Sequence, residues 1–541
     1  MNRIFTGGTI LTMADDKQVE AVYVEDNIIK AKGSLEDCKK VARWYEIVDL
    51  KGKCMTPGFV DTHTHPMMIG MCRIWADLDF PKVACIDDLV RVLKEHAETI
   101  PEEESICGYG FDQRMFKEKV HPTAKDLDRV STDRFVQIMH ASGHCNVVNT
   151  KLLRAIGVQD DTPDPPGGAF GRDHDGKPNG QLFDSANDLL SGIHGVRPQN
   201  HGPNIHMPGT EENLMKRFEV GQEFFVRAGI TTVNEVQLTK QELNTYLRAR
   251  DQGKLRMRLE MSFLSNYLDE VIDLGFNSDF GDNWLSIGSI KFYSDASLLS
   301  GTANVSTGYL DSERNKGYNY HEPEEMIEIL VKAHKNRLHT LTHACGDGAV
   351  DPIIDAIEKA QAEDPWPEAI HRVEHAGLVT EEQAIRMGKV GMIPSTQPEF
   401  LYLYGDGVVN GVGPEKGEEF MPMARFKKYC PYFTLSSDAP VTTPNPMESI
   451  STAVSRKTNL GTVMCPEQAI TVEDGLKGYT IYGARALRRD HICGSIEVGK
   501  LADFAVLSES PLDIPIEEIE KMREITVDET WLDGEKIYER K

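Results

Sequence analysis

Eight short apolar segments in the middle of the chain constrain its fold more than any other feature of the sequence. They alternate with amphipathic segments such as Glu322–Lys335 and Glu381–Val390, a pattern typical of parallel α/β sheets and barrels. Eight consecutive strands of this kind predict an α/β fold with a (β/α)8 barrel of the TIM type, and a doubly wound open sheet is the alternative. The predicted strands are Gly58–His63, Ile230–Val236, Arg256–Phe263, Ile287–Tyr293, His339–Thr342, His371–His375, Gly391–Ser395 and Phe433–Ser437.

The two ends of the chain and a long insertion complete the predicted architecture. Both ends alternate apolar and polar residues between turn signals, which predicts short strands. We expect residues 1–56 and 485–541 to form one small β-sandwich domain, and residues 57–67 with 213–484 to form the barrel. The segment after the first barrel strand is too long for a loop, so residues 68–212 are predicted to form an inserted, lid-like subdomain.

Composition excludes some classes of partner. The 541 residues carry 59 Lys and Arg against 85 Asp and Glu, a formal net charge of −26, which opposes binding to nucleic acid or to an anionic membrane. The 10 cysteines are scattered, and no apolar run is long enough to cross a bilayer. These features predict a cytoplasmic protein with reduced thiols, and they leave the oligomeric state open, with a homodimer as one arrangement.

Two histidines at the end of the first predicted strand are of the type that binds metal. Residues i and i+2 of a strand point to the same side, so His63 and His65 can bind one ion, and Pro66 then ends the strand. An isolated pair of this kind is more often two ordinary buried or surface histidines. The later strands therefore decide the interpretation.

Further ligand-type residues end three later strands. His343, His375 and Asp438 lie at strand ends, and Lys291 lies in the fourth strand. Each alone has an ordinary explanation as a packed imidazole, a helix cap or a paired cation. Because the carboxyl ends of barrel strands converge on one face, their joint occurrence favours a metal site. Imidazole and carboxylate ligands without thiolate suit Zn2+, with manganese, iron or nickel as alternatives.

Motifs along nearly the whole chain carry a resemblance to a known family. With them the chain resembles the amidohydrolase superfamily, and within it the YtcJ-like branch, which includes N-substituted formamide deformylases. The motifs are specific for the superfamily but are poor guides to the substrate. In chain order they read PGFVDTHTHP (57–66), GYGFDQ (108–113), GHCNVVNTKLL (143–153), IKFYSDASLLSGTA (290–303), THACGDGAV (342–350), RVEHAGL (372–378), SSDAPV (436–441) and VGKLADFAVL (498–507).

The resemblance implies a site with one or two divalent ions. His63 and His65, together with Asp438, would bind the more buried ion, and His343 and His375 would bind the second. The implied chemistry is attack by a metal-activated water, with Asp438 as general base and then general acid.

The resemblance also implies that CO2 converts Lys291 into a carbamate that bridges the two ions. A lysine ammonium has only donors and repels cations, whereas a carbamate is an anionic ligand with two oxygens. If Lys291 stays unmodified, a site with one ion is the alternative.

The implied function is that of a metal-dependent amidohydrolase. It would cleave an amide, formamide or cyclic amide bond of a small molecule, which is a carbon–nitrogen bond other than a peptide bond. The same metal site could instead serve deamination, or ester or lactone hydrolysis. A non-catalytic binding protein is a third hypothesis. It predicts that some of the metal-ligand residues are missing, whereas all six are present in this sequence.

Four residues of the insertion are predicted to contact the substrate. Phe111, Asp112 and Gln113 lie in one motif and His144 in another, and in the resembling branch such segments cover the barrel mouth. The alternative is that the aromatic residue packs in a core and that the aspartate forms a turn or cap.

Overall fold

The computed structural model divides the chain into two compact units. It describes residues 2–165, 168–190, 207, 209–310 and 315–541. The first unit combines residues 1–65 with residues 222–541, and the second unit spans residues 66–221. No helix in the described ranges is both long enough and apolar enough to cross a bilayer.

The first unit contains a barrel of eight parallel strands that are neighbours in chain order. The first and last strands meet where Thr62 Oγ1 donates to Thr434 Oγ1 over 3.0 Å and Asp438 N donates to His63 O over 2.8 Å. The predicted (β/α)8 barrel is therefore confirmed, and the open sheet is excluded. The strands are β8 (Phe59–Thr64), β15 (Ile230–Leu238), β16 (Arg258–Leu264), β18 (Leu285–Tyr293), β19 (His339–Ala344), β20 (His371–His375), β21 (Ile393–Thr396) and β22 (Thr434–Leu435).

Helices follow most of the barrel strands, and each buries one apolar face. In α10, Ile353, Ile354 and Ile357 are among the buried residues, at the spacing that makes one helix face apolar. The helix α11 begins at a capping box in which Thr380 and Gln383 bond each other's backbone N–H groups. The helices on consecutive connections are α7 (Lys240–Asp251), α8 (Leu268–Asp273), α9 (Pro323–Lys335), α10 (Val350–Glu363), α11 (Glu381–Lys389) and α12 (Pro398–Val412).

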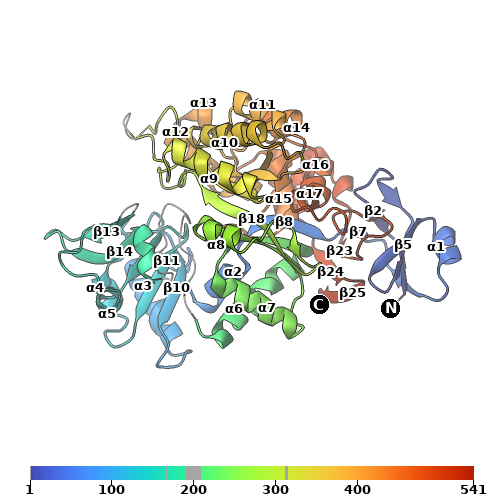
Figure 1. Ribbon diagram of the computed structural model, residues 1–541. Helices are drawn as coiled ribbons and strands as arrows, with labels where there is room; N and C mark the ends of the chain where they lie inside the picture. The colour runs from blue at the N-terminus through green and yellow to red at the C-terminus, as the bar shows by residue number, and fades with distance from the viewer. Residues whose placement is uncertain (1, 166–167, 191–206, 208, 311–314) are drawn as a thin grey trace. The chain divides into compact units, whose positions relative to one another are not determined.

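Strands from both ends of the chain build two further sheets in the first unit. Phe5 packs edge-on against Phe504 and Trp531, with ring centroids 5.2 and 5.0 Å apart, so both termini share one core. Figure 1 shows this in the blue and red strands that lie side by side near the labelled termini. Across the first sheet the strands are β5 (Ile28–Gly33), β4 (Ala21–Glu25), β1 (Arg3–Thr6) and β6 (Glu46–Asp49). Across the second sheet they are β25 (Glu535–Glu539), β24 (Val527–Leu532), β23 (Phe504–Leu507), β7 (Cys54–Pro57), β2 (Thr9–Leu11) and β3 (Gln18–Val19). The boundaries of the three predicted domains stay a prediction.

The second unit is built around a mixed sheet with apolar clusters of its own. One cluster includes Leu93, Phe111 and Val136, and another includes Met139 and Leu182. In order across the sheet the strands are β13 (Gly168–Arg172), β14 (Pro178–Asp184), β12 (Cys145–Val148), β11 (Val136–His140), β10 (Ile106–Phe111) and β9 (Ala76–Asp77).

Candidate metal centre

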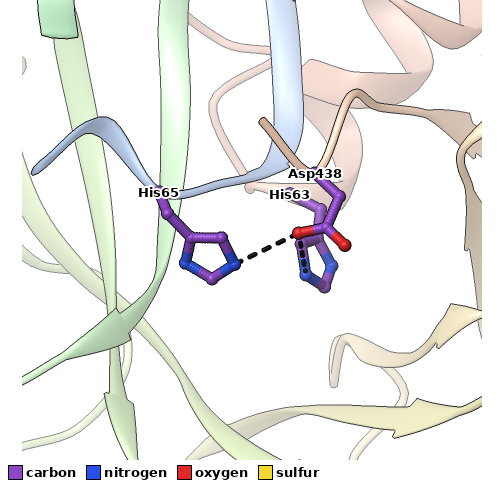
Figure 2. Close-up of side chains that lie close together, drawn as sticks. All are labelled: His63, His65 and Asp438. Carbon is purple, nitrogen blue, oxygen red and sulfur yellow. Dashed lines mark hydrogen bonds and ion pairs between the residues drawn. The ribbon is translucent and has the colours of Figure 1, made fainter. Parts of the chain in front are cut away.

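The histidines of the first strand and the aspartate after the last strand come together in the barrel. His65 Nε2 lies 3.1 Å from Asp438 Oδ1, and His63 Nε2 lies 3.6 Å from the same oxygen. One ligand atom from each residue lies within 4.8 Å of the others, and all three residues are buried. Figure 2 shows both imidazoles directed at the carboxylate. Three predicted ligands from the two ends of the barrel sequence thus form one group.

Backbone bonds between the first and last strands hold this group in place. Asp438 has a left-handed φ of 52°, a conformation that costs a residue with a side chain about 1–2 kcal/mol. Its N–H donates to His63 O over 2.8 Å, and its carbonyl accepts from Val441 N over 2.8 Å. Beside it, the carboxylate of Asp61 accepts from Ser437 N over 3.1 Å and from Ser437 Oγ over 2.5 Å. The closing contacts of the barrel therefore compensate a strained backbone at Asp438.

The other two predicted histidines extend the group. The ring centroids of His63 and His375 are 4.8 Å apart, and those of His375 and His343 are 4.3 Å apart. His375 also has a left-handed φ, of 68°, at the end of β20. The four imidazoles therefore form one continuous row at the carboxyl ends of three barrel strands, the face where barrel enzymes build their sites.

Lys291 lies in β18, next to this row. Its side chain is fully buried, and its Nζ makes no hydrogen bond within the described residues. The Nζ lies 4.7 Å from the ring centroid of Tyr293. The ring centroids of Tyr293 and His343 are in turn 5.1 Å apart. Burial lowers the pKa of Lys291 to about 8. A substantial share of this amine is therefore neutral near pH 8.

Burial keeps two of the imidazoles neutral, while a third is held in its charged form. Desolvation and then the charge of Lys291 hold the pKa of His63 well below its usual range, and burial with His63 does the same for His375. Burial would also lower the pKa of His65, but the carboxylates of Asp438 and Glu235 raise it to about 9. Burial opposes ionisation of Asp438, yet His63 and His65 hold its pKa below the usual value. His65 and Asp438 therefore form an ion pair that a cation would replace.

Two residues outside the predicted ligand set contact the outer nitrogens of the row. Glu374 Oε2 contacts His63 Nδ1 directly, while its Oε1 accepts from Arg372 Nε over 2.7 Å. Gln397 Oε1 accepts from His375 Nδ1 over 2.9 Å. With Nδ1 engaged in this way, His63 and His375 present Nε2 to the site. Glu374 stands beside His375 in the sequence, and its spacing of two from Arg372 was the available signal, because such residues share one side of a strand.

Three neighbouring groups lie close to Nε2 of His343. His343 Nε2 lies 2.9 Å from the carbonyl oxygen of Ala296, 3.4 Å from Cys345 Sγ and 3.8 Å from Asp295 Oδ1. Asp295 and Ala296 follow β18, the strand that carries Lys291, and Cys345 follows His343 at the end of β19. Burial raises the pKa of Cys345 well above its usual range, so this thiol is neutral.

The donor set of the row fits a divalent cation. Two imidazoles and a carboxylate converge, which is a typical first set of ligands for zinc and related ions. The buried Nζ of Lys291, without a hydrogen bond among the described residues, is the orphaned polar atom that a carbamate and its cation would satisfy. The structure thus brings the four histidines and Asp438 together beside Lys291, and their role as ligands stays a prediction.

The four residues predicted to contact substrate all belong to the second unit. Phe111 is fully buried, with its ring 5.2 Å from that of His140. Asp112 pairs with Arg114 over 2.7 Å, and His144 Nδ1 lies 2.9 Å from Asp184 Oδ1. Gln113 Oε1 is buried and has no hydrogen-bond partner among the described residues. Their contact with a substrate stays a prediction.

Comparison with known proteins identifies the family. The amidohydrolase family matches residues 46–538 of the chain. The chain belongs to the amidohydrolase family. The predicted recognition and enzyme class are thereby confirmed: the protein is a hydrolase that acts on carbon–nitrogen bonds other than peptide bonds.

Relatives of this amidohydrolase match it over nearly their full lengths. An N-substituted formamide deformylase from Arthrobacter pascens is 28% identical, covering 92% of this chain and 90% of its own. The putative amidohydrolase YtcJ from Bacillus subtilis is 27% identical and covers 100% of both chains. The crystal structure of an uncharacterized metal-dependent hydrolase from Pyrococcus horikoshii has 26% identity and a TM-score of 0.78, covering 96% of this chain and 99% of its own.

Proposed function

We propose that this amidohydrolase cleaves an amide, formamide or cyclic amide bond of a small molecule at a divalent metal centre. The observation that carries the proposal is the convergence of His63, His65 and Asp438 within 4.8 Å of one another inside the barrel. The likeness to a metal-dependent hydrolase and to an N-substituted formamide deformylase supports it. N-substituted formamides are therefore the first substrates to test. The proposed location of the protein is the cytoplasm, where free thiols such as those of its cysteines stay reduced.

His63, His65 and Asp438 would hold one ion, most simply Zn2+, and His343, His375 and a carbamate on Lys291 would hold a second. Such an ion supplies a Lewis acid that lowers the pKa of a bound water toward about 7 and polarises the substrate carbonyl. Burial contributes by removing competing water from the neutral imidazoles of His63 and His375.

Lys291 is suited to the carbamate because burial lowers its pKa to about 8. Its neutral amine attacks CO2, a carbon–nitrogen bond forms, and one proton leaves to solvent. The product is an anion in place of a cation, which turns a residue that repels metal into a ligand. Protein prepared in 13C-labelled bicarbonate should show one carbamate carbon resonance, and Lys291→Ala should lack it.

Asp438 would move the proton. Its Oδ1 is directed at the two imidazoles, so its Oδ2 is the oxygen that takes a proton from the attacking water and delivers it to the leaving nitrogen. The amide and one water thereby become a carboxylic acid and an amine. The carboxylate is kept ionised for this task by His63 and His65.

Replacing Asp438 by Asn tests this role. We expect Asp438→Asn to retain metal through the histidines but to lose turnover by about 10²–10⁴-fold, the usual contribution of a general base. Metal content by elemental analysis and kcat on the best substrate are the two measurements. A near-normal kcat with intact metal would contradict the assignment.

A substrate panel tests the reaction class. The enzyme is assayed with N-substituted formamides, N-acyl amino acids, cyclic imides, lactones and aminopurines. Turnover of the formamides or other amides is the expected result. Turnover of aminopurines alone would make the protein a deaminase, and turnover of lactones alone would make it an esterase-type hydrolase. No turnover and no bound metal would favour a binding protein.

A further inference from the structure

A second group of metal-type ligands lies beside the row of imidazoles. Asp295, His343 and Cys345 each offer one ligand atom, and these atoms lie within 4.8 Å of one another. Of the three, only His343 also belongs to the row of imidazoles. Cys345 is absent from the ligands that the sequence predicts, so this group has no role in the proposed reaction apart from His343.

The distances in this group match those between the ligands of one ion. His343 Nε2 lies 3.4 Å from Cys345 Sγ and 3.8 Å from Asp295 Oδ1. A tetrahedral zinc ion holds neighbouring nitrogen, sulfur and oxygen ligands roughly 3.3–3.6 Å apart. Adjustments of a few tenths of an ångström would therefore bring the three atoms onto one ion.

The backbone holds Asp295 in position for this role. Its Oδ1 accepts one hydrogen bond, from Cys345 N over 2.9 Å, and its Oδ2 accepts two, from Gly346 N over 2.8 Å and Asn304 N over 3.0 Å. Oδ1 therefore keeps a lone pair on the side of His343. The same loop that carries Cys345 thus fixes the carboxylate.

We propose that Asp295, His343 and Cys345 form a separate cation site, which binds a thiophilic divalent ion supplied in excess and inhibits the enzyme. On binding, Cys345 releases its thiol proton, and the proton on His343 Nε2, which faces the carbonyl of Ala296, moves to Nδ1 so that Nε2 can bind the ion. The thiolate makes the site prefer soft ions such as zinc and cadmium over magnesium or manganese. Inhibition follows because His343 then no longer serves the second ion of the proposed reaction, so this last step rests on the proposed function.

Binding is tested on the enzyme as isolated, with cadmium chloride as the probe. A site containing a thiolate should give a sulfur-to-cadmium absorption band in the ultraviolet, which ligands made only of nitrogen and oxygen do not give. The band should saturate near one equivalent, be absent in Cys345→Ser and persist in Cys465→Ser. Cys465 is the matched control because it is also partly exposed and belongs to no such ligand group among the described residues.

A second measurement needs no variant. Cadmium should slow alkylation of Cys345 by iodoacetamide at least about tenfold, read by mass spectrometry of its peptide, while Cys465 is unaffected. Excess zinc should inhibit the unmodified enzyme, and Cys345→Ser should need a concentration about tenfold higher or more for the same fractional inhibition. A band that persists in Cys345→Ser, or equal alkylation with and without cadmium, would overturn the site. An inactive enzyme that still shows the band and the protection would refute the proposed function alone.

Discussion

At the residue scale, Glu374 determines which nitrogen of His63 faces the proposed metal site. The Glu374 carboxylate contacts His63 Nδ1 and is itself fixed by Arg372, whose Nη2 donates to Thr62 O over 3.0 Å and to Asn234 Oδ1 over 2.8 Å. Glu374 is fully buried, so its charge acts in a low-dielectric interior. It therefore keeps the proton of His63 on Nδ1 and leaves Nε2 as the nitrogen that would bind the proposed ion.

Replacing Glu374 by Gln should weaken metal binding without removing any ligand. We expect the affinity for zinc to fall by about 10–100-fold, because partners of this kind orient the histidine and raise its basicity. Zinc titration against a competing chelator gives the affinity, and a thermal unfolding curve verifies folding. Glu324→Gln, at an exposed site on α9, changes the charge equally and should leave the affinity unaltered. An unchanged affinity in folded Glu374→Gln would exclude this role.

The convergence of the proposed ligands could be predicted from the sequence, but the contacts of Glu374 with His63 and of Gln397 with His375 could not. His63, His65 and Asp438 end strands of a barrel, and the barrel topology alone brings such residues to one face. The contact between Glu374 and His63 joins residues 311 positions apart, and it depends on side-chain conformation across the barrel interior. Cys345 is not among the predicted ligands because it follows the end of β19, outside the alternation of the strand.

At the element scale, the first barrel strand packs tightly against the second at its start. A Cβ at Gly58 would lie 2.2 Å from Thr231 Oγ1 and 2.5 Å from Thr231 Cγ2. Thr231 is buried in β15 and has little room to move. The glycine of the PGFVDTHTHP motif thus allows β8, which carries His63, to sit in register against β15.

The variant Gly58→Ala tests this close approach. Overpacking at a buried strand contact should lower the free energy of unfolding by about 1–3 kcal/mol. Gly407→Ala in α12 is the control, because a Cβ there meets nothing within 4 Å, and alanine favours a helix by about 1 kcal/mol. Urea unfolding midpoints of the two variants should therefore move in opposite directions. A Gly58→Ala midpoint equal to that of the unchanged protein would contradict the packing argument.

The existence of each barrel strand was easier to predict than its length. All eight predicted barrel strands are present, because buried parallel strands read as continuous apolar runs. The last one was expected over Phe433–Ser437 but spans only Thr434–Leu435. The left-handed φ at Asp438 turns the chain toward His63, and a strand pattern in the sequence does not reveal that turn. The mixed sheet of the second unit was not predicted: β10 pairs with β11 in parallel, and β12 pairs with β14 and not with β13, which follows it in the chain.

At the scale of the whole molecule, buried histidines away from the row tie stability to pH. His371 Nε2 lies 2.9 Å from His334 Nδ1, and His339 stacks on Trp366 with ring centroids 4.8 Å apart. Burial, and then the charge of Arg488, lower the pKa of His339 to about 3, and burial keeps that of His371 well below its usual range. In the unfolded chain both titrate near pH 6.5. The unfolded state therefore binds more protons below that pH, and the stability that these residues contribute is complete above about pH 6.5 and falls as the pH is lowered.

Replacing His339 by Phe should make the stability less dependent on pH. At pH 8 the variant should be less stable by about 1 kcal/mol, because Ile370 N loses its acceptor on His339 Nδ1, 3.0 Å away. Between pH 8 and pH 5 the unchanged protein should lose about 2 kcal/mol more than the variant does, since one buried imidazole no longer has to stay neutral. Urea unfolding at both pH values measures this, with His174→Asn as the control, because the side chain of His174 is 85% exposed. Equal pH dependence of His339→Phe and the unchanged protein would show that His339 does not couple folding to protons.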